Sequence, residues 1–482
     1  PGGKRRAGGR AEQSDQCLTN DALRAVQALM RGDLEPASPF GAAVHCNRRA
    51  APAAQRVTDT IGEAAGHFKR QLRADPLNGG RRTAGSLGRL MKQGDYVQRG
   101  QVCSADPSLV DLPRVATKLD TSAYLAGRHL RVNDGPDAVP LSSIDTAVVG
   151  MHWDPRLKPG SRGLLELCGR MWDAGMLEAL PGEGIGPGVS LFTVHKKYVD
   201  SVEHQRLVFD MRRCNLLFRP PPRATIGSLS TMAQLDVPAE ADLSAFALDV
   251  PDYFYRLRVS DPRLQRLFHV AGLSPADLAA YLRDRGDAAS ADRLLQCGAG
   301  GCLVMACVPM GWSWAPWLAQ LVLEDIVSDA LPDAPRLEHA RPPPALVTIA
   351  VMVYIDDVIG LVRGSRRATK RALALVRARL LNRGLDSHKE QIASGSECLV
   401  GLGATVDLGR REVRPQAAKL CLLLDATEQL LDAGSASPKE VQVVVGHWTH
   451  FLLLQRPMFC VLDAVYEFER RQPEMVPDGQ RC

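Results

Sequence analysis

The sequence is poor in aromatic residues, has no long apolar run and lacks closely paired cysteines. Aromatic side chains make up only 5% of the 482 residues, so we expect substantial loops. No window of eighteen residues is continuously apolar, so we expect neither a transmembrane helix nor a membrane partner. The twelve cysteines are scattered, several of them inside apolar runs. That pattern is typical of reduced thiols in an intracellular protein, and it does not distinguish the nucleus from the cytoplasm.

The first residues contain neither an initiator methionine nor the apolar core of a signal peptide. We therefore expect the chain to be a fragment or a processed piece of something longer. Its length predicts two or three structural units. With 45% hydrophobic and 23% charged residues, the composition is that of a globular protein. It excludes a chain disordered throughout, a collagen-like protein and a disulfide scaffold.

Positive charge is concentrated at the front of the chain. Residues 1–110 hold 17 Lys and Arg against 10 Asp and Glu, a balance of +7, whereas the whole chain carries +5. A basic segment ahead of a near-neutral body favours a polyanionic partner. A solvated tail explains the same charge equally well. The segment has little periodicity, and we expect a loosely ordered extension.

After residue 112 the pattern predicts strands alternating with helices. The expected strands cover residues 189–194, 206–209, 245–250, 303–308, 346–362 (interrupted at 356–357) and 398–406. The expected helices cover residues 21–30, 162–177, 262–300, 316–330, 365–383, 416–433 and 438–454. From 245 to 406 the order is strand, helix, hairpin, helix, strand, which is that of a ferredoxin-like split βαβ sheet.

Two adjacent acids, Asp356 and Asp357, interrupt an otherwise apolar, β-rich run. An unpaired buried carboxylate is very costly, so we expect both at the exposed tip of a hairpin. A simple polar turn would explain such a pair if it stood alone. Asp249, however, ends another apolar run, and in a ferredoxin-like sheet the two segments can lie side by side. Converging carboxylates suit Mg²⁺, and two such ions support phosphoryl transfer in polymerases, nucleases and cyclases.

Five segments in order resemble the reverse transcriptases, above all those of LTR and DIRS retrotransposons. The resemblance covers residues 162–454 and consists of Phe-Thr-Val-His-Lys-Lys at 192–197 with Arg-Leu-Val-Phe-Asp-Met-Arg at 206–212, Leu-Asp-Val-Pro-Asp-Tyr-Phe at 248–254, Val-Pro-Met-Gly-Trp at 308–312, Tyr-Ile-Asp-Asp at 354–357, and Gly-Leu at 384–385 with Lys389 and Leu-Val-Gly-Leu-Gly at 399–403. The 261–300 connection is longer than is usual between the motifs it joins.

The resemblance implies an α+β fold, namely a right-hand polymerase with a ferredoxin-like palm, fingers and a short helical thumb. The expected boundaries are 1–110 for the basic extension, 111–183 for a helical lead-in to the fingers, 184–415 for fingers and palm, and 416–482 for a thumb- or connection-like helical segment.

The same resemblance assigns roles to individual residues. It implies Asp249, Asp356 and Asp357 as the catalytic acids, holding two Mg²⁺ or Mn²⁺ ions together with the backbone carbonyl of Val250. Lys389 would donate a proton to pyrophosphate. The nucleotide-binding residues would be Lys196, Lys197, Arg206, Phe254, Met310 and Gly311. Lys and Arg suit triphosphate oxygens as a point charge and a bidentate fork. Lys197 could replace Lys196, because we expect the fingers loop to be longer than usual. A solvated strand end is the alternative for both.

Phe254 is expected beneath the incoming sugar, where a ring excludes a 2′-hydroxyl. Strand alternation would place Tyr253 and Tyr255 on the opposite face. The alternative is that Phe254 fills the core. Among the remaining residues, we expect Asp210 to pair with Arg212, and Trp312 and Trp314 to pack in a core or line the template.

The sequence therefore predicts an RNA-directed DNA polymerase, a nucleotidyltransferase derived from a retroelement polyprotein. Its partners would be an RNA template, a DNA or RNA primer and dNTPs. Two alternatives stay open. An RNA-dependent RNA polymerase usually carries Gly-Asp-Asp where this chain has Tyr-Ile-Asp-Asp. A decayed or domesticated nucleic-acid-binding protein would be expected to have lost a carboxylate.

Overall fold

The computed structural model describes residues 102–126, 144–338, 345–433, 436 and 438–462. The expected helix at 21–30 and most of the expected extension lie outside these residues. The chain divides into two compact units, one of residues 98–412 and a second whose described part is 413–462. The two units are treated separately below.

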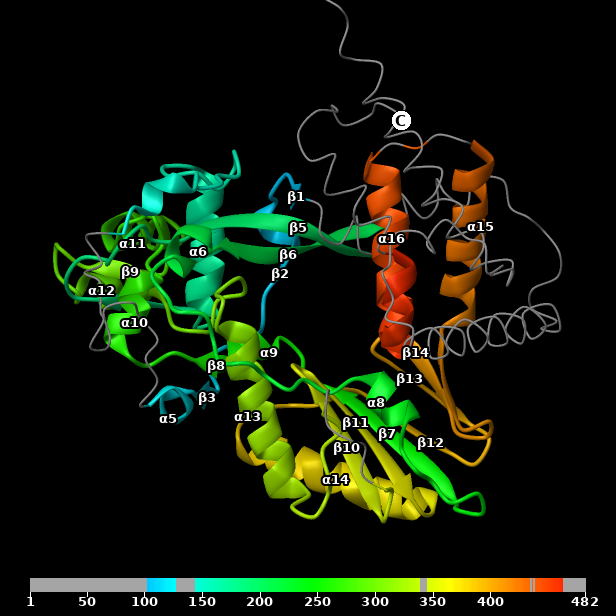
Figure 1. The fold of residues 1–482 in the computed structure, drawn as a ribbon. Helices are drawn as coiled ribbons and strands as arrows, with labels where there is room; N and C mark the ends of the chain where they lie inside the picture. The colour runs from blue at the N-terminus through cyan, green and yellow to red at the C-terminus, as the bar shows by residue number, and fades with distance from the viewer. Residues whose placement is uncertain (1–101, 127–143, 339–344, 434–435, 437, 463–482) are drawn as a thin grey trace, which may run out of the picture. The chain divides into compact units, whose positions relative to one another are not determined.

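The larger unit is a mixed α/β structure built on several small sheets (Figure 1). Its strands are β1 (Val102–Cys103), β2 (Val110–Asp111), β3 (Leu119–Asp120), β4 (Leu177–Leu180), β5 (Ser190–Val199), β6 (Val202–Asp210), β7 (Leu243–Asp249), β8 (Leu257–Arg258), β9 (Cys302–Met305), β10 (Ile349–Tyr354), β11 (Asp357–Arg363), β12 (His388–Ser394), β13 (Cys398–Gly401), β14 (Ala404–Asp407) and β15 (Glu412–Pro415), which crosses the boundary between the units. Its helices are α5 (Ser122–Leu125), α6 (Arg162–Asp173), α7 (Arg212–Asn215), α8 (Leu229–Ala233), α9 (Tyr253–Arg256), α10 (Pro262–Leu267), α11 (Pro275–Asp284), α12 (Ala288–Leu295), α13 (Ala315–Ala330) and α14 (Arg366–Asn382), with single 3-10 turns at Pro107–Leu109 and Thr146–Val148.

A four-stranded antiparallel sheet with the order β10-β11-β7-β12 lies at one end of this unit. Along the chain its elements run β7, α13, β10, β11, α14, β12, so each helix connects two parallel strands separated by one other strand. The two helices pack against one another, α13 against β10 and α14 against β7 and β12 (Figure 1). β7 is buried along almost its whole length, as expected for an apolar central strand.

The fourth strand of this sheet is not the one predicted from the sequence. The apolar run at 398–406 was expected to be the last strand of this sheet, but it forms the hairpin β13–β14, which continues into β15. The strand beside β7 is β12, whose first four residues are exposed and polar. An edge strand with an exposed polar half carries little hydrophobic pattern, which is why the sequence did not reveal it.

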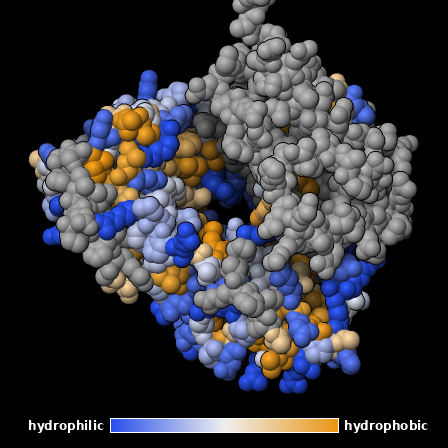
Figure 2. Space-filling model, in the orientation of Figure 1, coloured by the Kyte–Doolittle hydropathy of each residue, from blue (hydrophilic) through white to orange (hydrophobic). Residues whose placement is uncertain are grey.

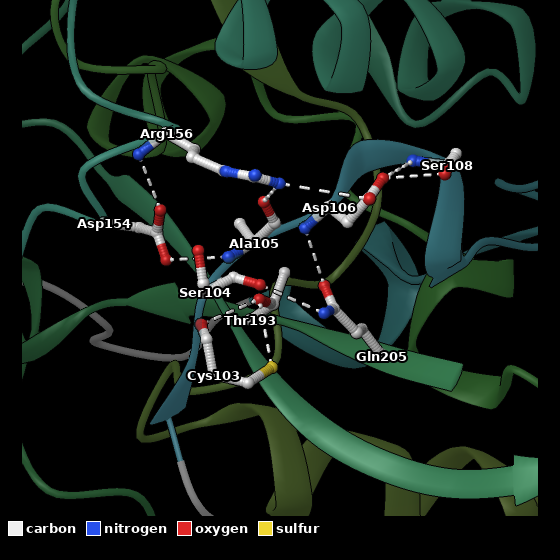
Figure 3. A network of polar contacts seen from close by, with 9 residues as sticks. All are labelled: Cys103, Ser104, Ala105, Asp106, Ser108, Asp154, Arg156, Thr193 and Gln205. Atoms are coloured by element: carbon white, nitrogen blue, oxygen red, sulfur yellow. Dashed lines mark hydrogen bonds and ion pairs between the residues drawn. The ribbon is translucent and has the colours of Figure 1, made fainter. Parts of the chain in front are cut away.

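A second four-stranded sheet, with the order β1-β5-β6-β2, is built around the long hairpin of β5 and β6. Residues 104–106 are held by two buried side chains, Gln205 of this hairpin and Asp154 of the segment before α6 (Figure 3). Gln205 donates to the carbonyl of Ser104 and accepts from the amide of Asp106, at 3.1 and 2.9 Å. Asp154 accepts from the amide of Ala105 at 3.1 Å. These contacts fix where β2 lies, and with it the Asp111 side chain.

Two of the expected boundaries are therefore wrong. Residues 102–110 were assigned to the loosely ordered extension, yet β1 pairs with β5 and β2 with β6. The 111–183 segment was expected to be a helical lead-in, but it also contains strands that pair with β6, β8 and β9. Strands of two to four residues are too short to give a periodic sequence signal.

The long 261–300 connection forms three short helices, α10, α11 and α12. Seven residues separate the first two, and three residues separate α11 from α12. α11 begins with a capping box, in which Ser274 and Asp277 satisfy each other's backbone amides. It packs against both α12 and α6 and buries Leu278 and Leu282. The connection is thus part of the folded core of this unit.

The smaller unit contains α15 (Ala417–Ala433), α16 (Pro438–Leu452) and the 3-10 segment Leu453–Leu462. α15 packs against α16, around a cluster that includes Leu423, Ala426 and Trp448. Trp448 donates its indole N–H to the hydroxyl of Thr427 at 3.1 Å. Among the described residues of the chain, no helix combines the length and the apolar character needed to cross a bilayer.

Candidate active site

Three carboxylates gather at one end of the central sheet, where β7 ends and the β10–β11 hairpin turns. Asp249, the last residue of β7, lies directly opposite Asp357, the first residue of β11. The amide of Val250 donates to the backbone carbonyl of Asp356 at 2.9 Å, which holds the hairpin turn against the end of β7. Like charges directly opposite one another destabilise a sheet, so this arrangement works against folding. Such a cost is typical of a functional site.

The turn that presents Asp356 is held by a buried glutamine. Ile355 has a φ of +57°, a left-handed conformation that is unusual for a β-branched residue. Its amide donates to the Gln320 side chain at 2.7 Å, while the Gln320 amide donates to the carbonyl of Val353 at 3.0 Å. Gln320 lies on α13 and is 2% exposed. This contact compensates the strain of the turn and fixes where the acids point.

The acids perturb one another electrostatically. Burial, followed by the charge of Asp249, raises the pKa of Asp356, although Lys389 and Arg206 act in the opposite direction. Burial, followed by the charges of Asp356 and Asp249, raises the pKa of Asp357 to about 7. The two side chains therefore lie close enough to Asp249 for the negative charges to interact.

Lys389 partly neutralises this cluster. Its ammonium lies 2.8 Å from Asp249 Oδ2, and the His388 ring nitrogen Nδ1 lies 3.5 Å from the same oxygen. The pairing of β12 with β7 shifts register after His388, and Lys389 has a φ of +50°. A bulge of this kind redirects a side chain, here toward the acids.

Asp249, Asp356 and Asp357 have the chemistry expected of Mg²⁺ ligands, and the ion pair between Lys389 and Asp249 shows that one of them attracts a cation. Within the described residues, no three side chains of His, Cys, Asp or Glu stand close enough together to chelate a metal ion as they are placed. Binding an ion would therefore require the carboxylates to turn toward one another and Asp249 to release the lysine.

Phe254 and its neighbouring tyrosines lie on a short helix, α9, and not on the strand that the alternation argument assumed. That part of the prediction is wrong. Tyr253 and Tyr255 are nonetheless buried, donating to the carbonyls of Ala319 and Leu207 at 3.1 and 3.2 Å. Phe254 is half-buried against the edge of the core. The two tyrosine rings therefore pack in the core with their hydroxyl groups hydrogen-bonded, and Phe254 is the aromatic ring of α9 that is partly exposed.

Lys196 lies within β5, where the strand register shifts between His195 and Lys197. Its ammonium is 2.8 Å from Asp111 Oδ2, and His204 Nδ1 is 2.7 Å from the other oxygen of the same carboxylate. Burial would raise the pKa of Asp111, but hydrogen bonds from Lys196 and His204 outweigh it and lower that pKa. We call these three residues the Asp111 cluster.

The long fingers loop that would have moved Lys197 into the role of Lys196 is absent. β5 and β6 are joined by Asp200 and Ser201, which have φ values of +48° and +67°, as in a tight two-residue hairpin turn. Lys197 is exposed. Arg206 lies on β6 in parallel register with Asp111, and it acts electrostatically on Asp356. The structure thus brings Arg206 into the neighbourhood of both Asp111 and the acids.

Met310 and Gly311 lie in the loop between β9 and α13. The Gly311 carbonyl accepts from Asn215 Nδ2 at 2.9 Å, and its φ is +110°, a conformation that favours glycine. Gly311 lines a cavity of 330 Å³ together with Phe209, Asp210, Met211, Arg212, His152 and Phe192. In the described part of the chain, no hydrogen bond or ion pair joins Met310 or Gly311 to the acids.

Two secondary predictions can be checked directly. Arg212 forms a bidentate pair with Asp210, at 2.8 Å for each contact, which confirms the expected pairing. Trp312 and Trp314 are 1% and 3% exposed and belong to the large hydrophobic core, so they pack and do not line a surface.

Sequence reasoning missed Gln320, Asp111, His204 and His388. Gln320 was detectable in principle, since it is a polar residue on the buried face of an otherwise apolar helix. Asp111, His204 and His388 gave no signal, because their importance depends on contacts between segments far apart in the chain.

Comparisons with known proteins add no family to this geometry. No family model matches the chain, and no curated protein matches it.

Proposed function

We propose that the chain is an RNA-directed DNA polymerase that adds deoxynucleotides to a primer by nucleotidyl transfer. The observation that carries the proposal is the cluster of Asp249, Asp356 and Asp357 at the end of one antiparallel sheet. Its like charges oppose folding, and its turn requires a left-handed isoleucine. The charge repulsion and the strained turn are explained if the carboxylates hold cations during the reaction.

In this proposal Asp249 and Asp356 would hold Mg²⁺ or Mn²⁺, with the carbonyl of Val250 as a further ligand. When bound, the ions would supply charge neutralisation for the attacking and leaving oxygens. The primer 3′-hydroxyl would lose its proton to solvent as its oxygen forms a bond to the α-phosphorus. The bond between the α-phosphorus and the bridging oxygen would break to release pyrophosphate. Lys389 would carry at Nζ the proton needed by that leaving group. Lys196 and Arg206 would bind the triphosphate.

The experiment is primer extension on a homopolymer RNA template, with and without Mg²⁺. We expect Asp356→Asn to lower nucleotide addition by at least about a thousandfold, because the amide retains the shape but loses the anionic ligand. The matched control is Asp252→Asn. Asp252 is also an acid beside the site, and its φ of +53° is one that asparagine tolerates. Activity of Asp356→Asn within a few-fold of wild type would reject the proposal. If neither the wild type nor Asp356→Asn extended the primer, a non-catalytic nucleic-acid-binding role would be favoured.

Phe254 separates DNA synthesis from RNA synthesis. We expect Phe254→Val to raise ribonucleotide incorporation by orders of magnitude, with a modest loss of deoxynucleotide use, because the ring would no longer obstruct a 2′-hydroxyl. The measurement is single-nucleotide extension with each sugar, compared as kcat/KM ratios. Tyr253→Phe is the control, since it removes a buried hydroxyl from the same helix. Equal losses with both sugars would assign Phe254 to packing alone.

A further inference from the structure

Helix α14 carries the longest purely basic stretch of the described chain outside the site. Residues 363–383 contain eight Arg and Lys and no Asp or Glu. The cations of its C-terminal half have acidic partners: Arg377 lies 3.7 Å from Glu390, and Arg379 lies 3.4 Å from Asp329. Arg383, just beyond the helix, lies 3.6 Å from Asp325. These ion pairs attach the helix to its neighbours.

The N-terminal half is different after its first residue. Arg366 forms an ion pair with Glu397. Arg367, Lys370 and Arg371 are exposed, and none of these three forms an ion pair or a side-chain hydrogen bond with a described residue. Their spacing of three and four residues places them on one face of the helix. We call this face, with Arg363 just before the helix, the α14 basic face.

The position of these cations works against folding. The N-terminus of a helix is its positive end, where acids are favourable and cations are unfavourable. α14 has no acid in its first turn, and Ser365 makes no capping hydrogen bond from its side chain. Three unpaired cations within the first two turns therefore destabilise the helix when nothing is bound, and a bound polyanion would remove this repulsion.

We propose that the α14 basic face binds the phosphate backbone of RNA, as a surface separate from the candidate active site. Positive charges at helical spacing neutralise phosphates and release counterions, and arginine forks bind phosphate oxygens. A membrane surface fits less well. An interfacial helix needs a broad apolar face that is free, whereas α14 buries Leu373, Val376 and Leu380 within the unit. Of its large apolar residues, Leu375 and Leu381 alone are exposed, which is too little for such a face. Figure 2 shows hydrophilic side chains along the lower edge, where Figure 1 places α14.

The test compares two triple variants of the whole chain that remove the same charge from the same helix region. One is Arg367→Gln, Lys370→Gln and Arg371→Gln; the control is Arg377→Gln, Arg379→Gln and Arg383→Gln, whose cations are already neutralised. The readout is binding of a mixed-sequence single-stranded RNA at several salt concentrations, without primer, nucleotide or Mg²⁺. Because catalysis is not involved, failure of the polymerase proposal leaves this result interpretable.

For the first variant we expect the slope of log K against log salt to become shallower by about 2, since each lost contact with single-stranded nucleic acid accounts for about 0.7. Affinity should fall at least about tenfold near 0.1 M salt. For the control we expect a slope change below about 0.5. The melting temperature of the first variant should not fall, because the cations it removes are adverse to the helix.

Equal slope changes in the two variants would overturn the proposal, as would a lower melting temperature of the first variant, which would make these cations structural. Vesicles containing phosphatidylserine and a poly-glutamate peptide are the competing partners. Loss of binding to either of these in the first variant, with RNA binding intact, would reject RNA as the occupant.

Discussion

The pKa values of carboxylates are shifted in opposite directions at the two sites, the acids at the end of β7 and the Asp111 cluster. Asp357 lies opposite Asp249 and beside Asp356, and burial with these charges raises its pKa to about 7. Asp111 instead accepts from Lys196 and His204, and those hydrogen bonds outweigh burial and lower its pKa. One site therefore has an excess of negative charge, whereas the other has a carboxylate that is paired with the Lys196 ammonium and hydrogen-bonded to His204.

The difference indicates what each site lacks. The acids need cations, and Lys389 supplies only one, through Asp249. In the Asp111 cluster the carboxylate already has hydrogen-bond partners. One of them is the Lys196 ammonium, which the proposed function requires for binding the triphosphate. If the proposed function holds, we expect Asp111 to keep Lys196 in place until a nucleotide competes for the ammonium. Arg206 lies close to both sites, as its effects on Asp356 and its register with Asp111 show.

The largest effect expected from this comparison concerns Lys196. Replacing it with methionine should lower kcat/KM for deoxynucleotides by about 10- to 100-fold, since one charge-assisted phosphate contact contributes about 1.5–3 kcal/mol. Lys197→Met is the control, because Lys197 is exposed on the same strand and should change kcat/KM by less than about threefold. Steady-state single-nucleotide extension measures both. Equal losses would mean that the two lysines act only as general positive charge.

The next effect concerns stability at the acids. Asp357→Asn should stabilise the metal-free protein at pH 8 by on the order of 2 kcal/mol, because it removes a buried charge that its neighbours repel. The sign follows from the raised pKa. Between about pH 4 and pH 7 the unfolded acid is ionised while the folded one keeps its proton, so wild-type stability falls as pH rises.

The advantage of Asp357→Asn should therefore shrink toward zero near pH 4, as measured by urea unfolding at several pH values. Asp252→Asn serves as the control here too. Destabilisation by Asp357→Asn at pH 8 would show that the carboxylate is already compensated in the folded chain.

These two sites also show what the sequence could and could not predict. The acids were identified because two charges interrupt an apolar run, which is a local signal. β12 was missed because its polar first half hides a strand, so the bulge that aims Lys389 at Asp249 was not anticipated. The alternation argument treated residues 252–255 as a strand, whereas the structure forms α9 there and buries Tyr253 and Tyr255 in the core.

The Asp111 cluster had no sequence signal at all. Asp111 was placed at the start of a lead-in segment, and its partners lie 85 and 93 residues further along the chain. Pairing between β2 and β6 creates the cluster, and a two-residue strand is too short to be recognised from periodicity. Contacts of this range depend on the folded topology and not on the local pattern.

The smallest expected effect is that of Asp111→Asn, and it has two parts that can be measured separately. The variant should be less stable than wild type at pH 7 by about 1 kcal/mol, because a partly buried carboxylate that is paired with Lys196 and hydrogen-bonded to His204 becomes a neutral amide. Since the folded pKa of Asp111 is lowered, this difference exists above about pH 4 and disappears as the pH falls through the folded pKa. The expected change in unfolding free energy is thus negative for Asp111→Asn and positive for Asp357→Asn, so the signs alone test the comparison between the two sites.

The second part of the Asp111→Asn prediction concerns nucleotide addition. Lys196 would no longer have to leave a charged partner, so KM for deoxynucleotides should fall about threefold, or about 0.7 kcal/mol. A rise in KM would instead show that Asp111 positions Lys196 for binding, and would reject the idea that the carboxylate competes with the triphosphate.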